Sequence, residues 1–192
     1  MNDLVKIFLT AMLIDNVVLM RFIALCPFIG MSNDVKKSAG MSLAVLFVTV
    51  LATAATWPLY MFVLKPMRLE FLQILTFILV IASLVQLVEF YLKKAAPALY
   101  SSMGVYLTLI TTNCAILAVT FDVIAKGYGF AQSMTYAVGV ASGFTLSLLL
   151  LAGIRERIKI APVPEFLKGT PILFVAAALL AMSFGGFAGL IK

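Results

Sequence analysis

The sequence predicts an all-α membrane protein that crosses the bilayer six times and forms one membrane domain, residues 1–192. Hydrophobic residues make up 64% of the chain and charged residues only 11%, whereas soluble domains carry about 25% charged residues. A bilayer-spanning helix needs about 20 apolar residues, so this apolar content suffices for about six spans. The composition therefore argues against a soluble enzyme, a nucleic-acid-binding protein and a disordered chain.

Long apolar runs predict the individual helices. The first segment, residues 4–30, is apolar but contains Asp15, Asn16 and Arg21. Each of the other runs is at least 18 residues long and contains no charged residue, as expected of a spanning helix. Because the runs lack the alternation of membrane β-strands, we expect helices and not a barrel. These five runs are 41–64, 71–88, 99–121, 127–154 and 169–191.

The six spans divide into two halves of three helices, residues 1–95 and 96–192. A shift of 88 residues places Cys26 on Cys114 and moves the second span, 41–64, into the fifth. Because each half has an odd number of helices, the halves cross the membrane in opposite senses, and we expect two inverted repeats. In transporters with such repeats the functional site lies near the membrane midplane, where the repeats meet.

The distribution of Lys and Arg predicts that both chain termini lie outside. Basic residues are more frequent in loops on the cytoplasmic side of a membrane. With an external N-terminus the inner loops hold eight basic residues and the outer segments hold five. The eight are Lys36, Lys37, Lys93, Lys94, Arg155, Arg157, Lys159 and Lys168, and the five are Lys6, Lys65, Arg68, Lys126 and Lys192.

The two cysteines each lie in the first helix of their half, beside residues that interrupt helices. Cys26 precedes Pro27, which lacks a backbone donor and crowds the preceding turn. Cys114 follows Thr112 and Asn113, whose side chains compete for backbone hydrogen bonds. We therefore expect the first helix of each half to be discontinuous, which would allow both thiols to lie near the midplane.

Two interpretations of these cysteines are open. In the first, each is a small buried hydrophobe, which is how cysteine commonly behaves. In the second, Cys26 and Cys114 are thiolate ligands of a soft metal ion or an iron–sulfur cluster. The chain contains no His and only these two Cys, so it cannot complete a four-thiolate cluster. A cluster would require two further cysteines from another chain or from a second copy of this one.

Three ionisable residues lie in or near the predicted spans, where such groups mark candidate functional sites. Asp15 and Arg21 are six residues apart, so they would not pair in an ideal helix. Arg21 either balances the negative charge of a thiolate-bound cluster, or it snorkels or pairs with another helix. Asp15 and Glu89 are candidates for an ion path, although Lys93 at i+4 favours a surface ion pair for Glu89.

Two pairs of glycines are spaced four residues apart, Gly139 with Gly143 and Gly185 with Gly189. Such pairs permit close contact between membrane helices. The pattern is common in membrane proteins, so we interpret both pairs as packing sites.

Three segments carry a family resemblance that covers essentially the whole chain. They resemble the A subunits of Rnf electron-transport complexes, and the related subunit of the sodium-pumping NADH:quinone reductase is similar. One departure is Asp15, where family members often have an uncharged residue. The three segments are Leu25-Cys26-Pro27-Phe28 with the following Gly30, Ile110-Thr111-Thr112-Asn113-Cys114-Ala115, and Gly153-Ile154-Arg155-Glu156-Arg157.

The resemblance implies a [2Fe–2S] cluster shared with a homologous E subunit, with Cys26 and Cys114 supplying half of its ligands. Residues around them, namely Pro27, Thr112 and Asn113, would support that site together with Arg21. The resemblance also implies a complex with Rnf subunits B, C, D and G in the inner membrane of a prokaryotic cell. Such a complex couples electron flow between ferredoxin and NAD to movement of Na⁺ or H⁺.

These observations favour an electron-transfer subunit of a translocase, inactive by itself. An alternative is a small six-helix transport or substrate-binding subunit without a redox cofactor, for which an inverted repeat would suffice. A third hypothesis is a purely structural assembly subunit. Only the first predicts that substitution of either cysteine removes iron from the assembled protein.

Overall fold

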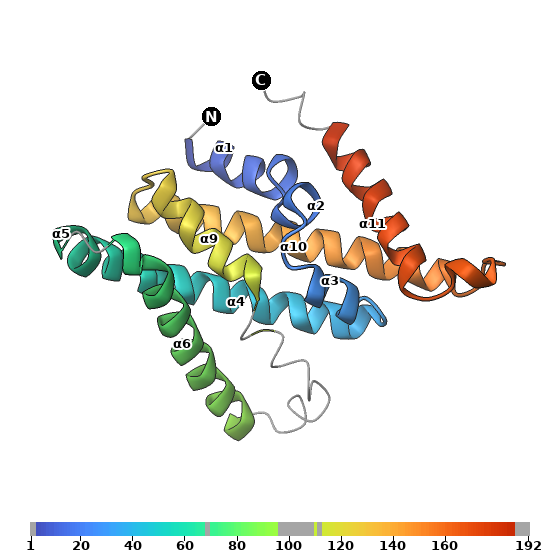
Figure 1. Ribbon diagram of the computed structural model, residues 1–192, viewed down its shortest axis with the longest axis horizontal. Coiled ribbons are helices and arrows are strands. Elements are labelled where there is room, and N and C mark those ends of the chain that lie inside the picture. The colour runs from blue at the N-terminus through green and yellow to red at the C-terminus, as the bar shows by residue number, and fades with distance from the viewer. Residues whose placement is uncertain (1–2, 68–69, 96–109, 111–112, 187–192) are drawn as a thin grey trace.

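The computed structural model describes residues 3–67, 70–95, 110 and 113–186, and every regular element in these ranges is a helix. Two long helices, α4 (Val35–Leu59) and α10 (Phe130–Ile158), pack along each other at the centre and run in opposite directions (Figure 1). Helix α9 (Cys114–Ala125) packs against α4. The predicted all-α class is confirmed.

Several helices are suited to a membrane. The helices Val35–Leu64, Gln73–Tyr91 and Phe130–Ile158 are long and apolar enough to span one, while α9 and α11 (Thr170–Gly185) are shorter apolar helices. Residues 96–109, in which the predicted span 99–121 begins, lie outside the described residues. The count of six spans and the two inverted repeats therefore stay predictions. The antiparallel course of α4 and α10, which would be equivalent helices, agrees with that repeat.

Short helical turns connect the longer elements. The chain leaves α4 through a π-helical segment, η2 (Tyr60–Leu64), and the short α5 (Lys65–Met67). A 3₁₀ turn, η3 (Glu70–Leu72), then leads into α6 (Gln73–Ala95). Another 3₁₀ turn, η4 (Glu165–Leu167), lies between α10 and α11.

Small hydroxyl side chains are buried along α4, the helix with the most extensive contact to α10. Each described hydroxyl of this set donates to a carbonyl in the preceding turn of its own helix. The polar groups are thus satisfied without a partner helix, and their small size allows close packing of membrane helices. The set comprises Ser38, Ser42, Thr49, Thr53 and Thr56.

The first segment is broken into four short pieces, as the predicted discontinuity requires. They are α1 (Asp3–Leu9), the π-helical η1 (Thr10–Ile14), α2 (Val17–Arg21) and α3 (Leu25–Met31).

The positions of the breaks differ from the expected one. The chain leaves the helix at 15–16 and again at 22–24, whereas Pro27 and Gly30 both lie inside α3. Pro27 is tolerated there because the first turn of a helix has no use for its missing N–H.

One of the two glycine pairs is a close packing site. A Cβ atom at Gly139 would lie 3.0 Å from the Phe8 carbonyl oxygen, and one at Gly143 would lie 2.8 Å from the Met12 carbonyl oxygen. The α1–η1 backbone therefore rests directly on α10, as the packing interpretation predicts. The other pair differs: a Cβ atom at Gly185 would meet nothing within 4 Å, and Gly189 lies outside the described residues.

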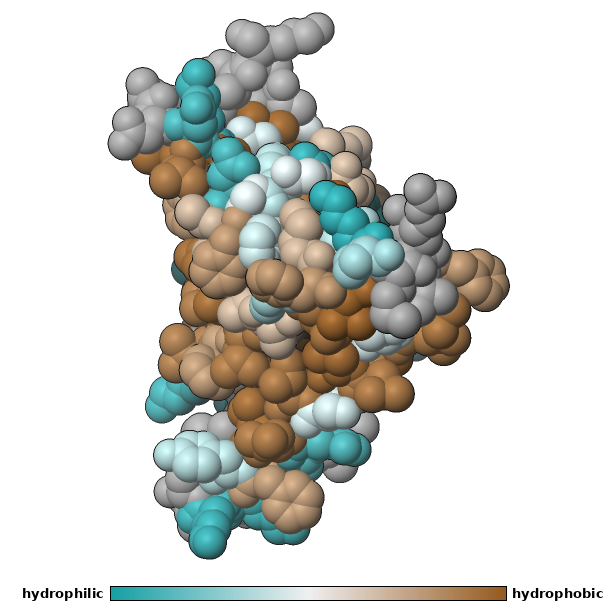
Figure 2. Space-filling view, turned by 90° about the vertical axis from the view of Figure 1, so that its left-hand side faces the viewer, coloured by the Kyte–Doolittle hydropathy of each residue, from teal (hydrophilic) through white to brown (hydrophobic). Residues whose placement is uncertain are grey.

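The outer surface is strongly apolar. Large hydrophobic side chains are exposed on α6 and around it, among them Phe71, Leu79 and Phe90. Figure 2 shows hydrophobic side chains gathered across the middle of one face, with hydrophilic ones towards its upper and lower ends. A soluble monomer rarely exposes so much contiguous apolar surface, so this surface is suited to contact with lipid or with partner helices.

Candidate functional site

Cys26 lies in the first turn of α3, directly after the second break. Phe22 and Ala24 both have positive φ angles, 53° and 67°, in the left-handed region that costs a non-glycine residue about 1 kcal/mol or more. Such backbone strain persists only where the surrounding structure enforces it, and it is frequent at functional sites. The side chain of Cys26 is exposed, whereas Phe28 beneath it is fully buried.

Cys114 occupies a similar position in the second half, as the first residue of α9. Asn113 caps this helix, because its backbone is extended and its Oδ1 atom accepts a hydrogen bond of 3.0 Å from the Ala115 N–H. The predicted interruption before Cys114 is therefore seen at Asn113. Thr112, which is predicted to support the site, lies outside the described residues.

The two cysteines share one structural setting. Their neighbours Ala24, Phe28, Ala115 and Ile116 belong to a single buried cluster at the centre of the molecule. Both thiols are nevertheless exposed on this chain and are not joined in a disulfide. Within the described chain neither side chain is buried, which differs from the interpretation of Cys26 and Cys114 as small buried hydrophobes. Each exposed thiol therefore lies next to residues of one buried cluster and is accessible to ligands from another chain.

The residues at this site fit an iron–sulfur cluster in part. Cysteine thiolates are the usual ligands of such clusters. Asn113 is only 5% exposed, and its Nδ2 atom has no hydrogen-bond partner among the described residues, so a buried donor remains next to Cys114. No three Cys, Asp or Glu side chains in the described ranges come together as a metal site. These residues can supply half of a ligand set.

Arg155 holds the far end of α3. Its Nη1 atom donates to the Ile29 carbonyl oxygen at 3.0 Å and to the Ser32 hydroxyl at 2.8 Å. Lys159, one turn further along α10, donates to the Asn33 carbonyl oxygen at 3.2 Å. A cation at the C-terminal end of a helix satisfies its last carbonyls and complements its dipole. Arg155 is thus a positioning residue for the short helix that carries Cys26.

Replacement of Arg155 by glutamine is expected to loosen α3, because hydrogen bonds from charged groups contribute about 1.5–3 kcal/mol. Hydrogen–deuterium exchange on the purified full chain should show faster exchange of the amides of residues 25–31. The variant Lys37→Gln removes a charge from an exposed position on the neighbouring helix and should leave this exchange unchanged. Equal exchange in wild-type protein and Arg155→Gln would contradict the assigned role.

A second polar cluster joins the two halves of the chain. Arg21 donates from Nη1 to Asp122 Oδ2 at 2.8 Å and from Nη2 to Asp15 Oδ2 at 3.0 Å. Lys126 lies 3.4 Å from the same Asp15 oxygen. The Tyr136 hydroxyl donates to Asp122 Oδ2 at 2.8 Å, and the Lys126 ammonium lies 4.4 Å from the centre of the Tyr136 ring. Two carboxylates and two cations balance each other here, so the cluster is neutral overall.

The direct pairing of Asp15 with Arg21 differs from the sequence-based expectation. In an ideal helix a spacing of six residues separates two side chains, but the chain breaks between η1 and α2. Of the two interpretations of Arg21, pairing with another helix is the one observed, through Asp122 of α9. Its role in balancing a cluster stays a prediction.

Asn16 fixes the first break. Its Oδ1 atom caps α2 by accepting from the Val18 and Leu19 N–H groups. Its Nδ2 atom donates across to the Gly143 carbonyl oxygen at 3.0 Å and the Ser147 hydroxyl at 2.9 Å. A single buried amide therefore holds the interrupted segment on α10.

Glu89 lies on α6, away from the polar clusters described above, and is half-buried. Its expected ion pair with Lys93 stays a prediction, and so does its place in an ion path. Asp122 and Tyr136 are functional residues that the sequence-based predictions lack, although Asp122 directly follows the charge-free run 99–121. A charge at the end of a predicted span was the signal that could have pointed to it.

The described part of the chain is all-helical and has an apolar outer surface, which defines a polytopic membrane protein. Its two exposed thiols lie at the starts of helices and form a candidate thiolate site. The chain belongs to the Rnf-Nqr family: residues 4–191 match the family described as Rnf-Nqr subunit, membrane protein.

Curated relatives span the same length. The chain is 51% identical to the A subunit of the ion-translocating oxidoreductase complex of Syntrophotalea carbinolica, over 100% of this chain and 99% of that protein. It is 48% identical to the protein of the same name from Cereibacter sphaeroides, over 99% and 98% of the two chains. It is 47% identical to the A subunit of the Na⁺-translocating ferredoxin:NAD⁺ oxidoreductase complex of Acetobacterium woodii, over 97% of each.

Proposed function

We propose that this chain is the A-type electron-transfer subunit of a membrane-bound, ion-translocating ferredoxin:NAD oxidoreductase. The names of relatives at 47–51% identity over nearly their whole length support membership of such a complex. The observation that carries the proposal is the matched placement of Cys26 and Cys114, both exposed and both in the first turn of a helix. A chain of this kind is one part of an enzyme and is not active alone.

In this proposal Cys26 and Cys114 hold half of a [2Fe–2S] cluster, and two cysteines of a homologous E-type subunit hold the other half. A bound cluster of this kind supplies one-electron transfer. The buried side chains below the thiols exclude water from one side of the site. The Nδ2 atom of Asn113 has no partner within the described ranges and is a donor available to a sulfur atom, and such hydrogen bonds tune the potential of iron–sulfur sites.

The proposed location is the inner membrane of a prokaryotic cell, with both termini outside and with B-, C-, D- and G-type subunits as further partners. The antiparallel course of α4 and α10 supports this orientation, because it brings the start of α4 and the end of α10 to one end of the bundle (Figure 1). Basic residues concentrate at that end, as expected on the cytoplasmic side. They are Lys36, Lys37, Arg155, Arg157, Lys159 and Lys168.

The ion path is part of the same proposal, with Asp15 and Glu89 as its candidate residues. Asp15 is paired with Arg21 and Lys126, so in this state its charge is already balanced. A role in ion movement would therefore require this cluster to open. Glu89 lies on α6 and is not part of this cluster, so its role in ion movement would not require the cluster to open.

The test is the iron content and visible absorbance of the full chain purified with and without its E-type partner. We expect iron in the ratio of one [2Fe–2S] cluster per pair of subunits, and little iron on the chain alone. A coloured dimer of this chain alone would show that a second copy supplies the missing ligands. A colourless, iron-free pair would contradict the proposal and favour the transport or substrate-binding alternative.

A further inference from the structure

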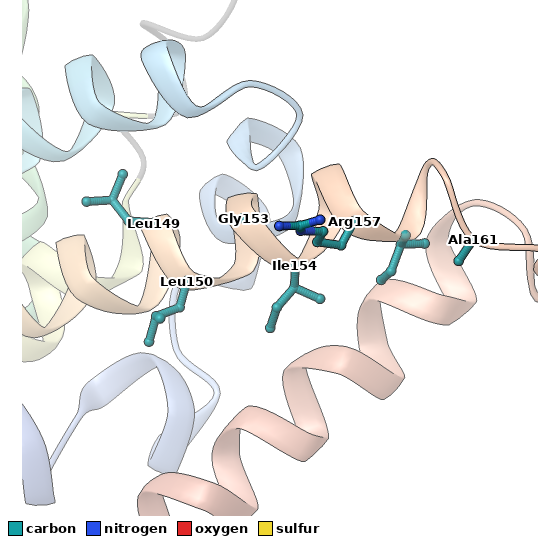
Figure 3. A pocket seen from close by; sticks show the side chains of 7 residues that line it. Leu149, Leu150, Gly153, Ile154, Arg157 and Ala161 are labelled. Carbon is teal, nitrogen blue, oxygen red and sulfur yellow. The ribbon is translucent and has the colours of Figure 1, made fainter.

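A shallow groove runs along one face of the last turns of α10, and its volume is about 520 Å³ (Figure 3). Most of its lining is apolar, with Leu149, Leu150, Ile154 and Ile158 on its walls. Arg157 lies near the end of this row and is the only charged residue among the described residues that line the groove. The groove therefore joins a long apolar surface to one positive charge.

Gly153 creates the depth of this groove. It lies between Leu149 and Arg157 on the same helical face, because residues four apart in a helix are neighbours. A Cβ atom at Gly153 would meet nothing within 4 Å, so this glycine is not required for contact with another element. The absence of a side chain at Gly153 leaves an open notch in the helix surface. At Gly139 and Gly143, by contrast, the backbone of α1 and η1 occupies the corresponding space.

More cations surround the end of the groove. An adjoining cavity of about 320 Å³ shares Ile158 with it and is lined by Arg155, Lys159 and Lys168. No Asp or Glu lines either space within the described part of the chain. Lys168 lies 3.9 Å from Glu165, whose side chain is 96% exposed. Arg155 and Lys159 donate to backbone carbonyls. Arg157 forms no ion pair with a carboxylate among the described residues.

The dimensions match those of a bilayer. Helix α10 has 29 residues and is about 43 Å long, which exceeds the hydrocarbon thickness of about 30 Å. A hydrocarbon layer centred on α10 would cover about 20 of its residues, with residues 149–154 inside it and Arg157 about one turn beyond its edge.

From this arrangement we infer that the groove binds an anionic phospholipid, with one acyl chain over Gly153 and the phosphate at Arg157. Basic pockets between membrane helices are known to suit anionic headgroups. The inference does not depend on the iron–sulfur proposal, since none of the residues that line the groove is a proposed ligand or supporting residue of the cluster.

The test is native mass spectrometry of the full chain in mild detergent, titrated with phosphatidylglycerol or with phosphatidylcholine of the same acyl chains. We expect wild-type protein to prefer phosphatidylglycerol. Arg157→Gln should lower the affinity for phosphatidylglycerol about fivefold, the effect of one basic residue near an anionic surface, and leave phosphatidylcholine unchanged. Gly153→Leu should weaken binding of both lipids, because it fills the notch.

Matched controls separate the groove from general effects. Lys37→Gln makes the same change of charge at the same end of the bundle, and Gly185→Leu adds the same side chain to another open helical glycine; both should bind as wild type. Inorganic phosphate should not displace the lipid. Wild-type binding by both Arg157→Gln and Gly153→Leu would overturn the inference, and so would displacement by phosphate. Normal lipid binding with lost assembly of Gly153→Leu into the complex would overturn it as well, and would identify a contact between subunits instead.

Discussion

Substitution of Cys26 or Cys114 by alanine is expected to abolish the iron–sulfur signal of the purified complex. Each thiolate would supply one of four ligands, and no His, Cys or carboxylate cluster elsewhere in the described chain can replace it. Iron content, visible absorbance and electron paramagnetic resonance of the reduced complex measure the loss directly. Electron transfer from ferredoxin to NAD should fall with the signal, since the proposed route through this cluster would be interrupted.

The fold should survive these substitutions, because both side chains are exposed and neither fills the core. The thermal unfolding midpoint and the recovery of assembled complex are therefore expected to match the wild type. As a comparison, Ala115→Ser changes a buried neighbour of Cys114 and keeps both thiols, so the iron should remain. Unchanged iron content in either cysteine variant would reject the ligand assignment, and unchanged activity as well would favour a transport subunit.

Replacement of Gly143 by alanine is expected to destabilise the folded chain by about 1–3 kcal/mol, the usual cost of overpacking a close contact. The added methyl group would lie 2.8 Å from the Met12 carbonyl oxygen and 3.2 Å from Asn16 Nδ2. The backbone of η1 must move away, and the hydrogen bonds that Asn16 donates to α10 lengthen or break. Reversible unfolding of the full chain in mixed micelles gives the change in free energy.

Two other glycines of the same helix calibrate this measurement. Gly153→Ala adds a methyl group in open space, and should leave stability unchanged or raise it by up to about 1 kcal/mol through helix propensity. Gly139→Ala meets the Phe8 carbonyl oxygen at 3.0 Å and should destabilise less than Gly143→Ala. Equal stability of Gly143→Ala and Gly153→Ala would show that η1 does not rest on α10 in the way described.

The spans that are described were predictable because lipid imposes a simple rule on sequence. A segment must be long, apolar and internally hydrogen-bonded to cross a bilayer. The helices α4, α6 and α10 are long and apolar enough to do so. A break in the first segment was also predicted, from Pro27 beside Cys26, but the breaks at 15–16 and 22–24 were not. The positive φ angles fall on Phe22 and Ala24, which are not helix breakers, while the expected breaker Pro27 is accommodated in a first turn.

The polar cluster around Asp122 illustrates a different limit. Its members lie far apart in the chain, and the order of residues does not say which carboxylate meets which cation. The expectation for Asp15 and Arg21 rests on the geometry of a continuous helix, which does not exist at this position. Their contact is possible because Asn16 interrupts the helix and binds α10.

By itself the sequence determined a six-span interpretation, the close packing of Gly139 and Gly143, and the scarcity of ligands that limits this chain to half of a four-thiolate cluster. Those properties depend on composition and on local spacing, which the primary structure states directly. Only the tertiary structure decided that both thiols are exposed above a buried core, that Arg155 holds α3, and that two balanced ion pairs join the halves. The last two depend on segments more than a hundred residues apart, whose approach results from the packing of α4, α9 and α10.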